Sequence, residues 1–357
     1  MTVRIGILGS ATDPQCELLR VALTARGAQV VLVESQALNQ GARCAFDGTA
    51  FWHADQRLDD VDGWFVRHAM SPLPPTFERD GDFRLFADWY VAYMQRRERY
   101  GFQLSLLLGA VRRGVPVVNP PTHGQLVQLK PLQLAIARGV GLAVPRTLIT
   151  SDPWRARAFI DEVGTAVYKP SMGGGPCCPV DGEALARLAE IAVAPVTFQE
   201  RVCGTPVRVI ALADSVLAAV AIPTDAVDYR TGSQFVSGQQ AYQPVALDDE
   251  VRHRCGALLR ECGLQFSAVD FVQRADGRLV FLEANSSPTY LDIERASGLP
   301  ITDRLADRML ELAGTAPAPA VVGPSPARSF AAYAVPFAPE RLVGGPGRSP
   351  VDDDDVE

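Results

Sequence analysis

Short apolar runs alternate with amphipathic stretches over the first 120 residues of the chain. Continuous apolar runs are typical of strands buried on both faces, whereas apolar residues at helical spacing indicate an amphipathic helix. The predicted strands are residues 3–8 (VRIGIL), 29–33, 62–67 and 115–119, and the predicted helix is residues 17–26. Strand, helix and strand in this order favour a parallel βαβ unit. The sequence therefore predicts a Rossmann-like α/β domain over residues 1–120.

A second pattern, over residues 83–113, has the periodicity of one long helix. Its first part carries an aromatic stripe, made up of Phe83, Phe86, Trp89, Tyr90 and Tyr93. Such a stripe is typical of core packing or of contact with a second copy. A homodimer or tetramer built on this helix is therefore an open alternative.

Beyond residue 120 the apolar runs come in pairs that are typical of antiparallel hairpins. The predicted strands are 145–149, 165–169, 196–202, the pair 207–213 and 216–222, and the pair 266–272 and 279–285; the predicted helices are 125–139 and 249–262. From residue 315 on, Pro, Gly and Ala and then acidic residues dominate. Such a segment buries too little apolar surface to order itself, which predicts a disordered tail over residues 315–357.

The composition excludes several classes of protein. With 47% hydrophobic and 21% charged residues, the 357-residue chain is of ordinary globular type. No apolar run reaches the roughly 18–20 residues of a membrane span, and the N-terminus predicts no signal peptide. The net charge is −7, and five acids lie in the last seven residues, so the rest of the chain is nearly neutral. A nearly neutral chain argues against nucleic acid as the main ligand, because that partner usually needs a basic face. Seven cysteines, an odd number, favour a reduced cytoplasmic setting over a disulfide framework.

Lysine is nearly absent from the chain. Lys and Arg together number 34, of which only Lys130 and Lys169 are lysines. In such an arginine-rich background, the two lysines are candidates for positions that need a compact ammonium group. Both are followed by proline, so neither belongs to a P-loop. The histidines are scattered and no Cys-x-x-Cys occurs, which argues against a structural zinc site.

The hairpin over residues 266–285 carries a candidate metal site. Glu283 and Asn285 are two residues apart on one strand and so share a face, and Asp270 on the preceding strand can reach the same side. Two carboxylates and an amide oxygen suit Mg²⁺, which prefers hard oxygen ligands and borrows phosphate oxygens. The alternative is a polar strand end with solvated charges.

Three further patterns accompany this hairpin. Lys169 ends a strand and precedes the glycine-rich loop 172–176, whose backbone amides are suited to phosphate groups. Residues 199–202 (QERV) end another strand and offer backbone groups to an adenine edge. Arg208 and Arg230 lie between these elements and supply guanidinium groups. Each pattern is weak alone, but their order along the chain is specific.

Taken together, these motifs resemble the ATP-grasp superfamily, in the branch of ligases that add glutamate to proteins or small acceptors or modify ribosomal peptides. The resemblance covers residues 119–313 and rests on VYKPSMGGG, FQERVCGTPVR, DYR, AVDFV and FLEANSSPTYLDIERASGLP. It implies a two-subdomain ATP-grasp domain over 121–314, with a central subdomain over 125–203 and a C-terminal subdomain over 204–314, preceded by the Rossmann-like domain.

The resemblance also implies a role for each candidate residue. Nucleotide binding falls to Lys130, Lys169, Gly173, Gly174, Gly175, Glu200 and Val202; the Mg²⁺ ligands, with Mn²⁺ as a possible substitute, are Asp270, Glu283 and Asn285; and Arg208 and Arg230 lie near the transferred phosphoryl group and the acyl substrate. Pro206 departs from the family, since it replaces the acidic residue that holds the ribose hydroxyls. The resemblance therefore assigns no ribose ligand in this chain.

The implied activity is that of an ADP-forming carboxylate–amine ligase. ATP would phosphorylate a carboxylate donor, and an amine acceptor (an amino acid, a peptide or a protein) would displace the phosphate. An ester from a hydroxyl acceptor stays open. One alternative is a nucleotide-binding protein of this fold that has lost catalysis, which Pro206 motivates. Another is a nicotinamide-dependent oxidoreductase, which rests on Glu34 at the end of the second strand.

Overall fold

The computed structural model describes residues 2–35, 43–67, 89–126, 129–172 and 175–315. Within them, the strands form four sheets, with the orders β2-β1-β6-β7, β3-β4-β5, β10-β9-β11-β8 and β14-β13-β12-β15-β16. This mixed α/β architecture agrees with the α/β fold class predicted from the sequence, in which the ATP-grasp part was expected to be α+β. The first sheet is parallel throughout, and the other three are antiparallel.

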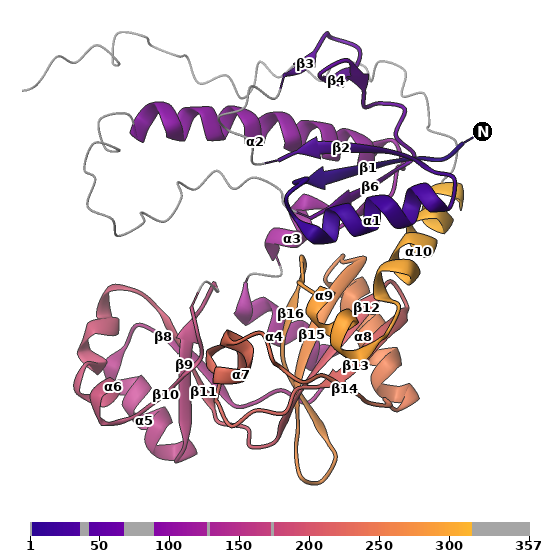
Figure 1. Ribbon diagram of the computed structural model, residues 1–357. Coiled ribbons are helices and arrows are strands. Elements are labelled where there is room, and N and C mark those ends of the chain that lie inside the picture. The colour runs from indigo at the N-terminus through magenta and orange to yellow at the C-terminus, as the bar shows by residue number, and fades with distance from the viewer. Residues whose placement is uncertain (1, 36–42, 68–88, 127–128, 173–174, 316–357) are drawn as a thin grey trace, which may run out of the picture. The chain divides into compact units, whose positions relative to one another are not determined.

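The parallel sheet consists of β1 (Arg4–Gly9), β2 (Gln29–Glu34), β6 (Gly63–Val66) and β7 (Val117–Val118). Figure 1 shows helices α1 (Pro14–Ala25) and α2 (Trp89–Arg112) on opposite sides of these strands. The side chains of β1 alternate accordingly. Ile5 and Ile7 pack with α1, whereas Leu8 packs with α2. These alternating contacts are the physical reason for the unbroken apolar runs in the sequence.

The short sheet comprises β3 (Cys44–Phe46), β4 (Phe51–His53) and β5 (Gln56–Arg57), between β2 and β6 along the chain. The sequence analysis did not predict these strands. Their two or three residues are too few for a period-2 pattern to stand out.

The four-stranded antiparallel sheet comprises β8 (Thr147–Thr150), β9 (Ala166–Pro170), β10 (Cys178–Pro179) and β11 (Val196–Glu200). Three helical segments accompany it: α5 (Pro153–Val163), α6 (Gly182–Ala186) and the 3-10 helix η2 (Leu188–Val193). Asp152 caps α5 by accepting hydrogen bonds from the backbone N–H groups of Trp154 and Arg155, at 2.9 and 3.2 Å. Ala156, Ile160, Ala166 and Phe198 form the core between sheet and helices.

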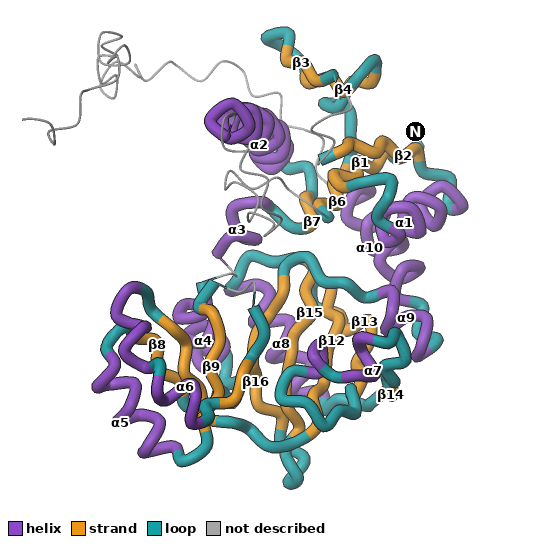
Figure 2. The backbone as a smooth tube through the Cα atoms, turned by 60° about the vertical axis from the view of Figure 1, so that its left-hand side comes forward, coloured by secondary structure: helices purple, strands orange, loops and turns teal. Residues whose placement is uncertain are grey.

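The five-stranded sheet comprises β12 (Thr205–Leu212), β13 (Ser215–Ala221), β14 (Gln243–Pro244), β15 (Phe266–Gln273) and β16 (Leu279–Asn285). Figure 2 shows these strands side by side with α8 (Asp249–Glu261) behind them. Alternate residues of β12 face two different cores: Val207 and Val209 pack with α8, whereas Ile210 and Leu212 face the opposite side. Both hairpins predicted for this region are present.

The chain returns to the parallel sheet at its C-terminal end. After β16 follow α9 (Leu291–Ser297) and α10 (Ile301–Thr315), and α10 packs against α1 and β6. Leu305 and Met309 of α10 share one core with Ile5 and Phe65. Arg26, the C-cap of α1, adds ion pairs to Asp303 and Asp307 of α10.

Between β7 and β8 the structure has α3 (Pro121–Leu126) and α4 (Lys130–Gly139), where a helix over 125–139 was expected. The small helices η3 (Tyr229–Thr231) and α7 (Ser233–Val236) lie between β13 and β14. The predicted long helix corresponds to α2, but residues 83–88 lie outside the described residues, as does the predicted tail beyond residue 315. None of the helices in the described part of the chain is long and apolar enough to cross a membrane.

Candidate active site

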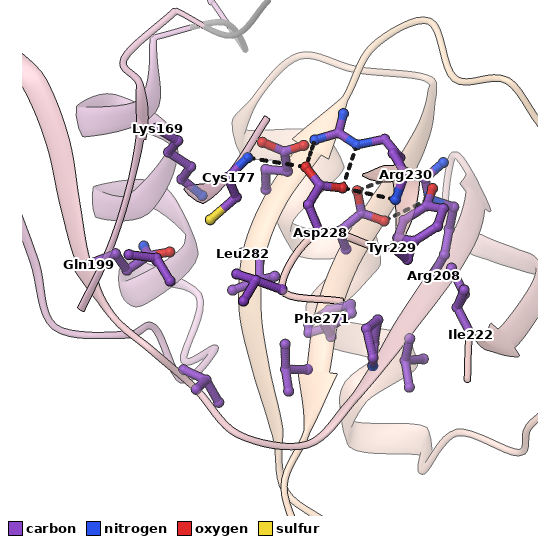
Figure 3. A pocket seen from close by; sticks show the side chains of 18 of the residues that line it. Lys169, Cys177, Gln199, Arg208, Ile222, Asp228, Tyr229, Arg230, Phe271 and Leu282 are labelled. Atoms are coloured by element: carbon purple, nitrogen blue, oxygen red, sulfur yellow. Dashed lines mark hydrogen bonds and ion pairs between the residues drawn. The ribbon is translucent and has the colours of Figure 1, made fainter. Parts of the chain in front are cut away.

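A pocket of about 500 Å³ collects the residues that the sequence analysis singled out. Ten of them line it: Lys130, Lys169, Gly175, Glu200, Val202, Arg208, Arg230, Asp270, Glu283 and Asn285. They come from α4, from the four-stranded and five-stranded sheets, and from the segments of Gly175, Val202 and Arg230 between the strands, over 150 residues of sequence. Gly173 and Gly174 lie outside the described residues. Figure 3 shows part of this lining, with charged side chains gathered on one side and apolar ones such as Phe271 and Leu282 below them.

Arg208 and Asp270 form one buried ion pair in this pocket. The strand register places them directly opposite each other on β12 and β15. Arg208 donates from Nε to Asp270 Oδ1 at 2.7 Å and from Nη2 to Oδ2 at 2.8 Å. Burial raises the pKa of Asp270, and the guanidinium of Arg208 opposes that shift. Burial lowers the pKa of Arg208, but the carboxylate of Asp270 outweighs it, so the guanidinium stays charged.

Lys130 and Glu283 form a second ion pair beside the first. Lys130 Nζ lies 2.8 Å from Glu283 Oε2. Burial favours protonation of Glu283, but Lys130 and Lys169 outweigh it and lower the pKa of Glu283 to about 2. Asn285 Nδ2 donates to Asp270 Oδ2 at 3.2 Å and approaches Glu283 Oε1 at 3.5 Å. The three predicted metal ligands therefore converge on one point.

Lys169 presents an unpaired ammonium group to the pocket. Among the described residues, its Nζ has no hydrogen-bond or ion-pair partner, and the side chain points toward the pocket in Figure 3. Burial lowers the pKa of Lys169, while the charge of Glu283 opposes this shift. A half-buried cation without a partner is costly unless an anionic ligand completes it.

Asp228 joins two parts of the site and was not among the predicted residues. Its carboxylate accepts from Arg230 Nε and Nη2, at 2.9 and 2.7 Å, and from the backbone N–H of Cys177 at 3.1 Å. Burial raises the pKa of Asp228, but these hydrogen bonds outweigh it and lower the pKa. Asp228 thereby fixes Arg230 relative to the end of the glycine-rich loop. The segment DYR signalled this in part, since an acid two residues before Arg230 can bond to it locally.

Tyr229 is a second missed residue. Its ring lies 5.6 Å from Cζ of Arg208, a cation–π contact. Burial raises the pKa of Tyr229 to about 12, so the phenol stays neutral at physiological pH. No local sequence pattern marks this contact, because it joins the η3 segment to β12 across the pocket.

A β-bulge on β16 adds Leu282 to the pocket. Asp270 pairs with Glu283 but Phe271 pairs with Phe281, so the register skips Leu282. Phe281 and Ala284, three residues apart, both belong to the core with α8, whereas Leu282 and Glu283 are neighbours and both line the pocket. Strict alternation, on which the sequence analysis relied, holds for Glu283 and Asn285 but breaks at this bulge.

The donor set of the pocket fits Mg²⁺. The described residues contain no group of three or more His, Cys, Asp or Glu side chains that could hold a metal. The predicted set has only two carboxylates plus the amide of Asn285, and this suits a cation that takes one or two carboxylates and completes its shell with water and phosphate. A site made of histidine ligands would instead favour other metals.

The chain matches the family model described as RimK-like ATP-grasp domain over residues 128–309. The chain belongs to the RimK-like ATP-grasp family. The matched range begins just before Lys130 and ends within α10, so it contains every residue of the pocket described above. The sequence-based assignment to this superfamily and branch is confirmed.

Two characterised relatives are ligases. The chain is 25% identical over 225 residues to the tetrahydromethanopterin:alpha-L-glutamate ligase of Methanocaldococcus jannaschii, covering 55% of this chain and 71% of the relative. It is 30% identical over 233 residues to the glutathione synthetase of Prochlorococcus marinus, covering 60% of this chain and 70% of the relative. As an ATP-grasp ligase of this family, the chain joins a carboxylate to an amine with release of ADP, which confirms the predicted activity.

The solved structures add an ATP-grasp ligase in complex with a precursor. The ATP-grasp ligase PsnB, in complex with a phosphomimetic variant of its minimal precursor, Mg and ADP, superposes with a TM-score of 0.76 at 28% identity. The match covers 87% of this chain and 98% of PsnB. It thus extends well beyond the range that the family model covers.

Proposed function

We propose that the pocket binds ATP and Mg²⁺ and uses them to activate a carboxylate of a peptide for amide bond formation. The observation that carries this proposal is the ammonium group of Lys169, which has no partner among the described residues and lies in one pocket with two ion pairs. Its natural complement is a polyanion such as a triphosphate. Lys130, Lys169 and the loop that ends at Gly175 hold the phosphates, and Glu200 and Val202 hold the adenine.

Asp270, Glu283 and Asn285 hold Mg²⁺ in this proposal. When bound, the ion offsets the charge of the phosphate oxygens. Because Arg208 and Lys130 already pair with the two carboxylates, the site stays near electrical neutrality before the ligands enter. Such prearranged charges need little reorganisation during the reaction.

The reaction has two steps. An oxygen of the substrate carboxylate bonds to the γ-phosphorus of ATP while the bond to the β–γ bridging oxygen breaks, which yields an acyl phosphate and ADP. The nitrogen of an amine then bonds to the acyl carbon, phosphate leaves, and the amine gives up a proton to solvent. Arg208 and Arg230 stabilise the negative charge that develops on the transferred phosphoryl group.

A peptide is the substrate class that we favour over a free amino acid. PsnB, which has also been solved with a precursor peptide and AMPPNP, superposes over 87% of this chain, including residues before the range of the family model. We further propose that residues 1–120 form a Rossmann-like domain, which the parallel order β2-β1-β6-β7 supports, and that 121–314 form the ATP-grasp domain. A cytoplasmic location stays a prediction; in its favour, all seven cysteines are free thiols.

The test is ADP release with Mg-ATP against pools of peptides rich in Asp and Glu, and against pools of amino acids. Hydroxylamine in the assay traps an acyl phosphate as a hydroxamate. Mass spectrometry detects the loss of one water per bond formed, and later treatment of the product with hydroxylamine cleaves an ester but spares an amide. Glu283→Ala should abolish ADP release. ADP release only with amino acids would overturn the peptide assignment, and full activity of Glu283→Ala would overturn the metal assignment.

The catalysis-lost alternative makes the opposite prediction, namely nucleotide binding without ADP formation from any pool. The intact ion pairs around Asp270 and Glu283 do not favour it. The oxidoreductase alternative rested on Glu34, and the contacts of this residue do not favour it. The Glu34 carboxylate accepts a hydrogen bond from the backbone N–H of Ala11 at 2.7 Å. Glu34 thus stabilises the turn after β1.

A further inference from the structure

The loop that leaves β16 is held by side chains from the first 120 residues of the chain. Each residue of this loop, 286–290, contacts one of them: Asn119 Nδ2 donates to Ser286 O, Arg67 to Ser287 and Thr289, Gln15 Nε2 to Pro288 O, and Gln15 Oε1 accepts from Tyr290 N. The loop begins directly after Asn285. Its conformation therefore sets where the amide of Asn285 lies.

Arg67 makes the largest number of these contacts. It follows β6, at the C-terminal edge of the parallel sheet. Nη1 donates to Ser287 O at 2.9 Å and to Ser287 Oγ at 2.7 Å, and Nη2 lies 3.4 Å from Thr289 Oγ1. Ser287 Oγ donates back to Arg67 O at 2.5 Å. Ser287 is thus bound to both the side chain and the backbone of Arg67.

The charge of Arg67 is almost fully buried and is balanced by Asp13. The residue is 9% exposed, and Nε donates to Asp13 Oδ2 at 2.9 Å. The other oxygen of Asp13 accepts from the backbone N–H of Gln15 at 2.8 Å, at the start of α1. Asp13 therefore orients both Arg67 and Gln15, the two residues that form hydrogen bonds with residues 287–290. Burying a guanidinium group costs free energy of desolvation. Its planar fork of N–H donors can, however, bind several acceptors at once.

We propose that Arg67 is a positioning residue for the metal site: it fixes the loop after Asn285 so that the amide of Asn285 lies against Asp270 and Glu283. The proposal rests on the proposed function of the pocket. Arg67 does not line the pocket, so it acts through Ser287 and the backbone. Removing the guanidinium frees the carbonyl and hydroxyl groups of Ser287 and the hydroxyl of Thr289. The amide of Asn285 then loses its fixed position against Asp270 and Glu283. Residues that orient metal ligands in this way strongly affect metal affinity.

The test compares Arg67→Met with Arg26→Met as a matched control. Arg26 also joins the first helix to a later element, α10, through Asp303 and Asp307, and none of these three residues lines the pocket. Binding of Mn²⁺ to the enzyme–ADP complex is followed by electron paramagnetic resonance, and binding of ADP without metal is followed by calorimetry in the presence of a chelator. Thermal unfolding is recorded for each variant.

For Arg67→Met we expect Mn²⁺ affinity to fall about 10-fold or more, while metal-free ADP affinity stays unchanged. Arg26→Met should change neither affinity, although it lowers the unfolding temperature. Should Arg67→Met fail to fold, Ser287→Ala decides the matter, because it removes the hydroxyl contacts and keeps the backbone; it should weaken Mn²⁺ binding in the same direction.

Two outcomes would overturn the inference. Unchanged Mn²⁺ affinity in the folded Arg67→Met protein, or in Ser287→Ala if that protein is the one that folds, would show that the loop does not orient Asn285. An equal loss of Mn²⁺ and metal-free ADP affinity would mean that Arg67 only supports the fold. If the native enzyme itself binds neither ADP nor Mn²⁺, the proposed function fails first, and the role of Arg67 falls with it.

Discussion

Arg208 on β12 and Asp270 on β15 lie directly opposite each other and form a two-point ion pair, with N–O distances of 2.7 and 2.8 Å. Both side chains are largely buried, with 12% and 16% of their surfaces exposed. The pair thus places a fixed positive charge beside the carboxylate that we propose as a metal ligand, and both residues line the pocket. With Mg²⁺ held at this carboxylate, a phosphoryl group beside the ion would also meet the guanidinium of Arg208.

Replacing Asp270 by Asn should abolish ADP formation and leave the charge of Arg208 buried without a carboxylate partner. Breaking such a pair lowers the free energy of unfolding by about 3–5 kcal/mol. Chemical denaturation and an ADP assay measure both effects. Asp276→Asn is the control, because its ion pair with Arg278 in the same hairpin is exposed and contributes at most about 1 kcal/mol. Wild-type ADP formation by Asp270→Asn would contradict the assignment.

Lys169→Met should weaken binding of a non-hydrolysable ATP analogue about 10-fold or more, a loss of about 1.4 kcal/mol. Lys169→Arg should restore little of this affinity, because a planar guanidinium does not replace a compact ammonium at a half-buried position. Calorimetric titration gives both values. Arg157→Lys, in an exposed ion pair on α5, should bind as the wild type does. An arginine at position 169 that binds the analogue normally would refute the requirement for lysine.

Gly204→Ala should destabilise the protein strongly. Gly204 has φ +154°, and an added Cβ would lie 2.0 Å from the backbone oxygen of Gln273. Gly277→Ala is a matched control, because Gly277 also has a positive φ, of +83°, but an added Cβ would meet nothing within 4 Å. Backbone strain alone costs about 1–3 kcal/mol, so Gly204→Ala should exceed this range and Gly277→Ala should fall within it. Equal unfolding temperatures for the two variants would contradict the clash.

His53 should make stability depend on pH. Burial lowers the pKa of His53, although the charge of Glu34 opposes this, and the buried Nε2 has no hydrogen-bond partner among the described residues. The folded protein binds a proton at His53 less tightly than the unfolded chain does. The contribution of neutral His53 to the free energy of unfolding is therefore complete above the unfolded pKa of about 6.5 and is lost as the pH falls below it. Denaturation curves between about pH 8 and pH 5 give the free energy of unfolding at each pH. This free energy should fall less steeply with acidification for His53→Gln than for the wild type. Parallel pH profiles would rule out this role.

Much of the secondary structure was accessible from local patterns. The strands β1 and β6 are buried on both faces, and the edge strand β2 is partly buried; all three have apolar runs in the sequence. The hairpins of the five-stranded sheet appear as paired runs. The short strands β3 to β5 escaped prediction because three residues do not establish a period. The break between α3 and α4 also has no strong local signal beyond Pro131, which lies in the first turn of α4.

The sequence predicted which residues form the candidate site, but it did not predict which of them pair with one another. The two lysines, the acid pair and the arginines were identified by composition, by spacing and by resemblance to a family. Asp228, Tyr229 and Leu282 were missed, since a bulge and two contacts across the pocket bring them to the site. The clamp of Arg67 on Ser287 joins residues 220 positions apart, a separation at which no local pattern carries information.

The sequence by itself determined the longer strands and several of the helices, and also that Glu283 and Asn285 share a face, because these properties follow from a repeat of two or 3.6 residues along the chain. It also determined the chemistry available, since only two lysines exist to meet phosphates. Only the tertiary structure decided that Arg208 faces Asp270, that Lys130 faces Glu283 and that Lys169 has no partner within the described part of the chain. These choices depend on strand register and on helix docking, which are fixed by packing between residues distant in sequence.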